Sequence, residues 1–403
     1  MLLNIGRAKM SSVIDEAVKK GKCTGCGSCY HSCPKDLITY KENNEGFIVA
    51  EILESNACSN CGLCLKKCPS NKKLNPYPQN THVYYGYAGI TSIRANATSG
   101  GICSAFAEDF LKCNEMVVCA KFDFETGDIK HSEINYDCWT NSMKTFYCQS
   151  NQIDSFSQIK KSLKNDRRVL FIGTPCQVHG LKQYLGGETE KLLTIDFLCH
   201  GVPSRKLFRQ YYNKISKKEI EDYNFRSKCN GWPKHMLAIR FKNGKVIKCK
   251  ATLDKYQFLF QEDLSLNSAC FFCPFRAQHS ADITVGDFWM WEKENLKPSE
   301  IGMGFSIVIP NTIKGENALE SARNVGNLVL HEAKSTYRDT VLHEVQFNFN
   351  KYKRREEFFH YYTMKGYEKT IFRYATILNA IKLKVKYMLN KLGAKQIYET
   401  RDE

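Results

Sequence analysis

Short apolar runs alternate with amphipathic stretches through the middle of the chain. Runs typical of β-strands occupy residues 83–88, 116–122, 168–172, 192–198, 282–287 and 305–309. Residues 99–112 repeat apolar positions at a spacing of three to four, which predicts a helix. Strands that alternate with helices predict an α/β domain whose functional loops lie at the strand ends.

The last part of the chain has a different pattern. Residues 237–250 predict a β-hairpin around Asn243-Gly244, a favoured two-residue turn. After about residue 340 the sequence becomes helical, aromatic and basic, and residues 372–392 form a strongly amphipathic segment. We expect this segment to be a helix packed on the body of the protein, and peripheral membrane contact is the alternative.

The pattern divides the chain into four parts. Two prolines and several polar residues between positions 70 and 81 indicate a linker. We expect a small cysteine-rich domain at residues 1–72, the linker at 73–82, a large α/β domain at 83–345 and a basic helical extension at 346–403. The expected fold class is therefore multidomain, α+β in the small domain and α/β in the large one, with a helical C-terminal segment.

The small domain contains the same cysteine spacing twice. Each run reads C-x2-C-x2-C-x3-C-P, and the runs are Cys23, Cys26, Cys29 and Cys33, then Cys58, Cys61, Cys64 and Cys68. This is the spacing of bacterial ferredoxins with two [4Fe–4S] clusters, in which the fourth cysteine of a run ligates the cluster of the other run. We expect one cluster on Cys23, Cys26, Cys29 and Cys68, and another on Cys58, Cys61, Cys64 and Cys33. Such a module transfers single electrons.

Other cysteine chemistries fit this pattern less well. Zinc ribbons use ligand pairs rather than runs of four that end in proline. A disulfide framework is disfavoured because the chain is long and has no secretory segment. The N-terminus lacks a hydrophobic signal core, and no apolar run approaches the roughly 18 residues of a membrane-spanning helix. We therefore expect a cytoplasmic protein whose nineteen cysteines are thiols or cluster ligands.

The chain is basic, with a formal net charge of +16. Each cluster with four thiolates would carry about −2, so three clusters would remove about six charges and leave the chain basic. Nucleic-acid binding has only this charge in its favour, because no helix-turn-helix, RNP or zinc-finger pattern is present. An acidic cofactor, an acidic partner or an anionic membrane surface explains the charge as well.

A second group of cysteines lies in the large domain. Most of the cysteines outside the two runs are scattered without ligand spacing, but Cys176 and Cys199 follow predicted strands, and Cys270 and Cys273 form a C-x-x-C-P pair. Together these four could hold a third [4Fe–4S] cluster across a sheet edge. A redox-active dithiol at Cys270 and Cys273, or a zinc site, is the alternative.

Six segments of the large domain carry a family resemblance. They read R-A-N-A-T-S-G-G-I-C, F-I-G-T-P-C-Q-V-H-G-L-K-Q-Y-L, T-I-D-F-L-C-H-G-V-P-S, N-F-R-S-K-C-N-G-W, C-F-F-C-P-F and A-D-I-T-V-G-D-F-W. In this order they resemble the coenzyme F420 hydrogenase/dehydrogenase beta-subunit family over roughly residues 82–345. The resemblance implies an FAD beside a [4Fe–4S] cluster, with Cys176, Cys199, Cys270 and Cys273 as the ligands of that cluster.

The expected flavin site lies at the loops of the α/β domain. Gly-Gly at the start of a helix lets backbone amides approach a pyrophosphate, although an ordinary helix start explains the same residues. The predicted cofactor-binding residues are Thr98, Ser99, Gly100, Gly101, Gly173, Thr174, Pro175, His200 and Gly201. Thr174 and His200 are also the candidate catalytic residues, and a bonded loop hydroxyl and a surface imidazole are their alternatives.

The resemblance implies an oxidoreductase that uses reduced coenzyme F420, a hydride carrier with an anionic tail, or another small molecule. Asn267 and His279 stand in regions where many relatives carry arginine, and Met290 stands where many carry glycine, so the two-electron substrate stays open. We also expect an electron-transfer partner, such as a ferredoxin or a redox enzyme subunit, that exchanges electrons with the clusters of the small domain. The alternatives are a non-catalytic subunit that connects a partner enzyme to ferredoxin, and a reductase in cell-surface polysaccharide synthesis.

Overall fold

The fold is known from a computed structural model. It describes residues 20–53, 57–71, 82–136, 144–215, 219–276, 279–334 and 349–376, together with residues 18 and 139.

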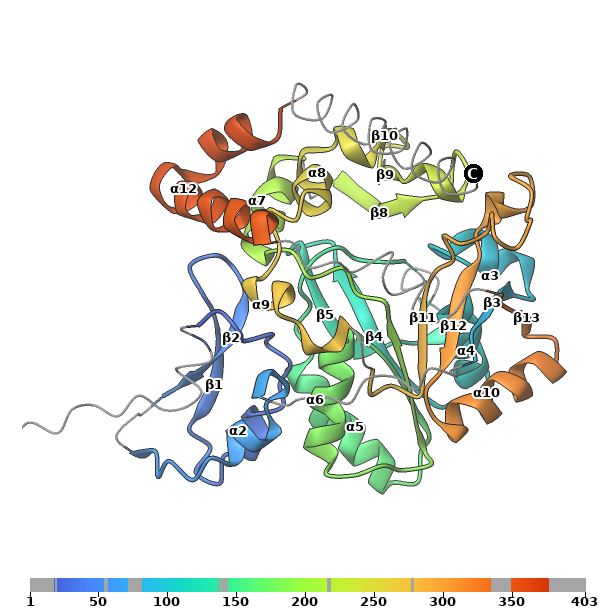
Figure 1. Cartoon of the computed structure of the whole chain (residues 1–403), viewed down its shortest axis with the longest axis horizontal. Helices are drawn as coiled ribbons and strands as arrows, with labels where there is room; N and C mark the ends of the chain where they lie inside the picture. The colour runs from blue at the N-terminus through green and yellow to red at the C-terminus, as the bar shows by residue number, and fades with distance from the viewer. Residues whose placement is uncertain are drawn as a thin grey trace, which may run out of the picture.

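An eight-stranded sheet forms the centre of the large domain (Figure 1). Its order is β13-β3-β12-β11-β7-β6-β4-β5, and β4, β6, β7 and β11 run parallel, while β5, β12 and β13 are antiparallel to their neighbours. The strands are β3 (Tyr84–Ala88), β4 (Met116–Asp123), β5 (Asp128–Glu133), β6 (Val169–Ile172), β7 (Leu192–Phe197), β11 (Ile283–Asp287), β12 (Ser306–Pro310) and β13 (Leu328–Glu332).

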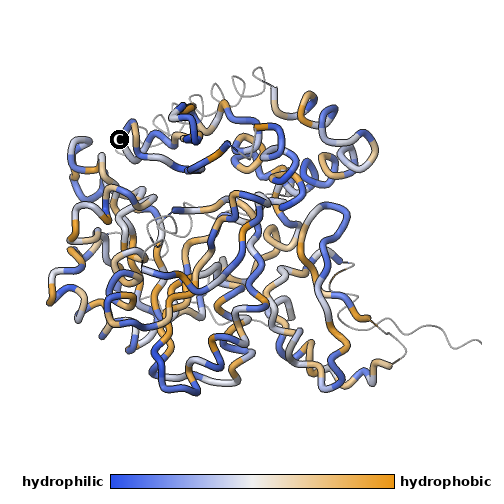
Figure 2. Tube along the Cα trace, turned by 180° about the vertical axis from the view of Figure 1, so that it is seen from behind, coloured by the Kyte–Doolittle hydropathy of each residue, from blue (hydrophilic) through white to orange (hydrophobic). Residues whose placement is uncertain are grey.

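Helices cover both faces of this sheet. Along β4, successive side chains point to opposite faces, so Met116 and Val118 pack with α5 and α6, and Val117 packs with α4 and α10. All three residues are completely or almost completely buried. The helices that cover the two faces are α3 (Thr91–Asn96), α4 (Ile102–Lys112), α5 (Ile153–Lys164), α6 (Pro175–Leu185) and α10 (Ile313–Asn324). Figure 2 shows hydrophobic residues concentrated along the inner strands.

A second, antiparallel sheet of three strands lies beyond the large sheet, with α7, α8 and α12 beside it (Figure 1). An aromatic core that includes Phe208, Tyr223, Tyr256 and Phe358 joins these elements. Gly366 has a non-helical backbone and kinks α12. The elements are α7 (Arg205–Lys214), β8 (Ile220–Ser227), β9 (Met236–Phe241), β10 (Val246–Lys250), α8 (Lys255–Gln261), α9 (Ser268–Phe271) and α12 (Phe349–Tyr374).

The N-terminal module is small and packs against the large domain (Figure 1). It contains an antiparallel pair, β1 (Ile38–Glu42) and β2 (Ile48–Ile52), and the short helix α2 (Leu63–Lys67). Phe47 of the module is buried in the same core as Phe358 of α12. Glu45 of the module forms an ion pair with the buried Arg355 of α12. The module is therefore part of one packed body.

The predicted α/β architecture is confirmed at the level of the strands. All six expected runs form strands of the large sheet, and the hairpin around Asn243-Gly244 is the β9–β10 pair. The pattern missed β5, β8 and β13. The predicted linker lies almost wholly outside the described residues, and so does most of the amphipathic segment 372–392. Within the described part of the chain, no helix has the length and apolar character needed to cross a membrane.

Candidate functional site

Four cysteines of the module come together beside α6. Cys23, Cys26 and Cys29 lie on one loop, and Cys68 follows α2. Burial raises the pKa of Cys23 and Cys29, and the nearby Cys68 thiol raises both further. We call these four residues the inner set. Gly25 permits this loop, because it has a φ of 69° and a Cβ there would lie 2.4 Å from the carbonyl oxygen of Ile48.

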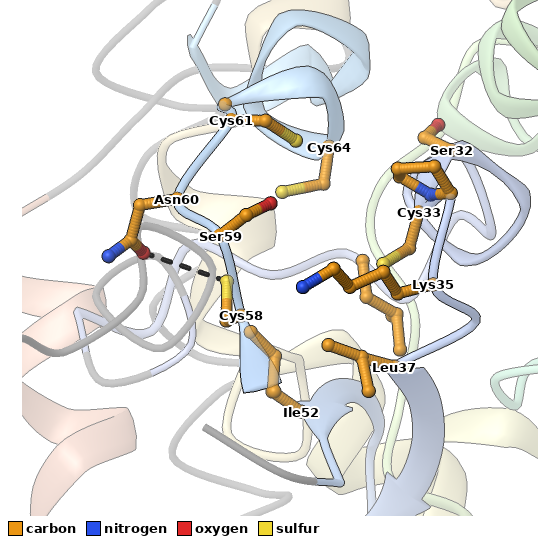
Figure 3. Close-up of a pocket in the computed structure, with 13 residues that line it drawn as sticks. Ser32, Cys33, Lys35, Leu37, Ile52, Cys58, Ser59, Asn60, Cys61 and Cys64 are labelled. Carbon is orange, nitrogen blue, oxygen red and sulfur yellow. Dashed lines mark hydrogen bonds between the residues drawn. The ribbon is translucent and has the colours of Figure 1, made fainter. Parts of the chain in front are cut away.

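The remaining four cysteines of the two runs line a single pocket, shown in Figure 3. We call them the outer set, and they are Cys33, Cys58, Cys61 and Cys64. Cys61 is exposed, so this set reaches the molecular surface. The Cys64 thiol is also one of the neighbours that raise the pKa of Cys29, so the outer set adjoins the inner set. Each fourth cysteine therefore lies with the other run, in the arrangement that the spacing predicts.

The four cysteines predicted in the large domain also lie together. Burial raises the pKa of Cys199 well above its usual value, and the adjacent Cys270, Cys176 and Cys273 raise it further. We call them the domain set. Cys176 is the second residue of α6, Cys199 follows β7, and Cys270 lies in α9. The backbone N–H of Val202 points to the Cys270 sulfur at 3.4 Å.

The inner and domain sets meet at Cys176. Its thiol is a neighbour of both Cys23 and Cys26 and raises the pKa of each, after the larger effect of burial. Helix α6 packs directly on the module here, because a Cβ at Gly180 would lie 2.3 Å from the carbonyl oxygen of Cys26. The three sets therefore form a series from the exposed outer set, through the inner set, to the domain set.

Three buried glutamines fix the module to the strand ends of the large domain. Gln149 accepts a hydrogen bond from the N–H of Ile48 at 2.7 Å, and its amide donates to carbonyl oxygens of the module. The amide of Gln152 donates to the carbonyl oxygen of Gly25 at 2.8 Å. Gln177 of α6 donates in turn to Gln152 at 3.1 Å. This chain of amide groups connects the first cysteine loop to the helix that carries Cys176.

Two of the three residues that depart from the family pattern, Asn267 and His279, form hydrogen bonds or ion pairs with groups elsewhere in the chain. Asn267 donates to the carbonyl oxygen of Cys23 at 3.2 Å, while its side-chain oxygen accepts from the N–H of Ala269 and caps α9. It therefore bridges the inner set to the helix of Cys270. The Nδ1 of His279 lies 2.9 Å from both carboxylate oxygens of the fully buried Asp196, at the end of β7.

The predicted flavin turn is held by the protein's own groups. Thr98 accepts from the N–H of Thr145, the Ser99 hydroxyl donates to the carbonyl oxygen of Phe305, and the N–H of Gly100 donates to the Ser306 hydroxyl. A Cβ at Gly100 would lie 2.5 Å from the carbonyl oxygen of Gly86. The packing of this turn against β3 and β12 therefore requires a glycine at position 100, whether or not a ligand binds. Gly101, with a φ of 89°, precedes α4.

The loops after β6 and β7 hold the other predicted residues. Gly173 follows β6, Pro175 begins α6, and the Thr174 hydroxyl lies 3.2 Å from the Cys176 sulfur. Gly201 packs against Cys270, because a Cβ there would lie 3.2 Å from the Cβ of that cysteine. The His200 Nε2 lies 2.5 Å from Asp263, which also pairs with Lys351 of α12. Thr174 thus contacts a domain-set thiol, whereas His200 is bound to a carboxylate.

A partly buried cationic cluster lies next to the Ser99 turn and was not predicted. It consists of Arg94, Arg226, Lys228 and the carboxylate of Asp287. The Lys228 ammonium donates to the carbonyl oxygens of Arg94, Ser99 and Met303. Burial and the charges of Arg94 and Arg226 lower its pKa to about 7. The segment N-F-R-S-K-C-N-G-W contains two of these residues, but nothing in it shows that Arg94 and Asp287 join them.

The other described cysteines lie outside the three sets. Burial raises the pKa of both Cys103 and Cys148 to about 12, while Cys113 and Cys229 are exposed. Cys138 lies outside the described residues. Within the described ranges, no three histidine, cysteine or acidic side chains are grouped so as to hold a single metal ion.

Two parts of the chain match models of known protein families. Residues 166–336 match the family model described as the C terminus of the coenzyme F420 hydrogenase/dehydrogenase beta subunit. Residues 22–72 match the model of a 4Fe-4S dicluster domain. The resemblance that the motifs indicated is confirmed over these residues. All twelve predicted cluster cysteines fall within the two matched segments, whereas the turn at residues 98–101 does not.

Comparison with curated proteins and with solved structures gives weaker similarity than the family models. No curated protein matches the chain. Among solved structures, it is similar to a chain of "Xenon derivatization of the F420-reducing [NiFe] hydrogenase complex from Methanosarcina barkeri". The two share 15% sequence identity with a TM-score of 0.46, over 72% of this chain and 94% of that chain.

Proposed function

We propose that this chain, an iron–sulfur electron-transfer protein related to the beta subunit of coenzyme F420 hydrogenase, is a flavoprotein oxidoreductase. Its function would be electron transfer between ferredoxin-type [4Fe–4S] clusters and a small-molecule hydride carrier, with FAD as the converter. When bound, the clusters would supply single-electron transfer, and the flavin would supply exchange between one-electron and two-electron carriers. Coenzyme F420 is the first candidate carrier.

The three cysteine sets fit the clusters chemically. Each provides four thiols, the soft ligands that iron–sulfur clusters use. In each set the thiols raise one another's pKa, because their anionic forms repel unless a cationic core lies among them. The residues that would hold the clusters are those of the outer, inner and domain sets defined above.

The observation that carries the proposal is the contact between the inner and domain sets. Cys176 lies beside Cys23 and Cys26, and Gly180 brings the backbone of α6 against Cys26. Electron transfer falls steeply with distance, so a fixed contact between redox sites is what a relay requires. A module held by buried glutamines, by the Arg355–Glu45 ion pair and by a shared aromatic core keeps this distance constant.

Support for the flavin end comes from the edge of the large sheet. Cys176 lies in the first turn of α6, shortly after β6, Cys199 lies in the loop after β7, and Asp287 ends β11. Ligands of α/β proteins usually bind at such carboxyl ends. The Ser99 turn and the cationic cluster lie at the same edge, because Gly100 packs against Gly86 and Ser306, and Ser306 pairs with Asp287 in the sheet.

The protein reconstituted anaerobically with FAD should accept a hydride directly. Reduced coenzyme F420, added without any second protein, is expected to bleach the flavin absorbance, and reduced nicotinamides serve as control donors. Bleaching by one donor alone would also identify the carrier.

A different result would favour the second candidate function, a subunit that connects a partner enzyme to ferredoxin. One observation supports that candidate, namely that the polar groups of the predicted flavin turn already bond within the protein. It would be preferred if no hydride donor bleaches the flavin until a second subunit is added.

A further inference from the structure

The cationic cluster beside the Ser99 turn carries uncompensated charge. Arg94 and Arg226 contribute two positive charges and Asp287 one negative charge, while Lys228, whose pKa is about 7, is partly charged at neutral pH. His235 adds none at neutral pH, because burial and the Arg226 charge lower its pKa to about 4. The cluster therefore has a net charge of at least +1, and net charge held away from water is costly unless an anion lies near it.

Within the described part of the chain, two hydrogen-bond donors of Arg226 are also unsatisfied. Its side chain is buried, with 5% exposed, and its Nη1 pairs with Asp287. Its Nε and Nη2 have no hydrogen-bond partner of normal geometry among the described residues, although Tyr147 lies nearby. Buried guanidinium donors without partners are destabilising, whereas a phosphate can accept two parallel hydrogen bonds from one guanidinium.

Flat aromatic surfaces lie beside these donors. Trp232 and Trp289 stack with their ring centroids 4.6 Å apart, and the Arg226 guanidinium carbon lies 5.2 Å from the centre of the Trp289 ring. Trp232 donates to Asp287 at 3.2 Å, so the carboxylate is shared between the indole and the guanidinium. Stacked indole rings beside guanidinium donors that lack well-formed hydrogen bonds suit a phosphorylated ligand that carries a planar ring.

We propose that Arg226, supported by Arg94 and Lys228, is the subsite that binds the phosphate groups of a ligand at the strand ends. The inference rests on the proposed function, because the phosphates could be those of the flavin dinucleotide. They could equally belong to a phosphorylated small-molecule substrate. In both cases the ligand would supply the negative charge that the cluster lacks.

The test compares Arg226→Gln with the native chain and with Arg240→Gln, a control that removes an exposed guanidinium from β9 in the same small sheet. Binding of FAD, riboflavin and inorganic pyrophosphate is measured on the reconstituted full chain, together with iron content and thermal unfolding. For Arg226→Gln we expect affinity for FAD to fall about tenfold to a hundredfold, as for a lost charged hydrogen bond, with riboflavin binding and iron unchanged.

The outcomes distinguish a flavin subsite, a substrate subsite and a purely structural role of Arg226. Unchanged FAD affinity with a similar loss of pyrophosphate binding would assign the subsite to a phosphorylated substrate. Unchanged binding of both would overturn the proposal. Arg226→Lys keeps the charge beside Asp287, so if both variants lose iron and unfold earlier, the role of Arg226 is structural and the proposal is also overturned. If the native chain binds no flavin, the proposed function fails, while the pyrophosphate measurement still tests the subsite.

Discussion

Replacing Cys176 with alanine is expected to lower the iron content of the full chain from about twelve to about eight atoms, because the domain set loses one of its four ligands. Cys176 is also the residue where this set meets Cys23 and Cys26. The flavin should therefore no longer be reduced by ferredoxin, while a hydride donor should still reduce it. Iron and sulfide analysis and anaerobic stopped-flow absorbance measure the two effects.

The control for this variant is Cys113→Ala. Cys113 is an exposed cysteine at the end of α4 and belongs to none of the three sets. Its replacement should leave both the iron content and the reduction of the flavin by ferredoxin unchanged. If Cys176→Ala retains about twelve iron atoms, the ligand assignment in the domain set is wrong.

Replacing Gly180 with alanine should push the module away from α6. The new Cβ would lie 2.3 Å from the carbonyl oxygen of Cys26, a backbone atom that cannot move without moving the cysteine loop. Overpacking of this kind costs about 1–3 kcal/mol, which exceeds the gain of about 0.5–1 kcal/mol that alanine brings to a helix interior. We expect earlier thermal unfolding and slower electron transfer from ferredoxin to the flavin.

Gly187→Ala is the matched control, because a Cβ at this nearby position meets no atom within 4 Å. It should behave as the native chain in both measurements. Equal stability and equal transfer rates in the two variants would show that the packing of α6 on the cysteine loop does not hold the relay together.

The strands of the large sheet and the grouping of the cysteines could be predicted from the sequence. Short apolar runs such as residues 192–198 are bounded by clear turn signals, so the strands of the large sheet could be identified. Each cysteine run encodes its own loop, and the family resemblance brings Cys176 and Cys199 together with the C-x-x-C pair. The structure places these residues as neighbours, as predicted. Iron ligation itself stays a prediction.

Contacts between distant segments could not be predicted. Gln149 and Gln152 look like ordinary polar residues, and only the folded chain shows that they are buried against the module. Gly180 lies within α6, and nothing in the neighbouring sequence indicates that another backbone approaches it. Arg94 and Lys228 are separated by more than a hundred residues, so their shared charge cluster is a property of the tertiary structure alone.

The alternation of polar and apolar residues also gives too little signal for strands at the margins. Strand β10 is largely exposed and was identified only through its turn, while β5 and β13 lie at the two edges of the large sheet. An edge strand needs fewer apolar residues because it has one neighbour, so its sequence resembles that of a loop.

The most direct test of the account is the iron, acid-labile sulfide and flavin content of the full chain, purified and reconstituted without oxygen. Three cysteine sets and one flavin site predict about twelve irons, about twelve sulfides and one FAD per chain. Zinc in place of iron, or about eight irons with no flavin under any condition, would contradict it.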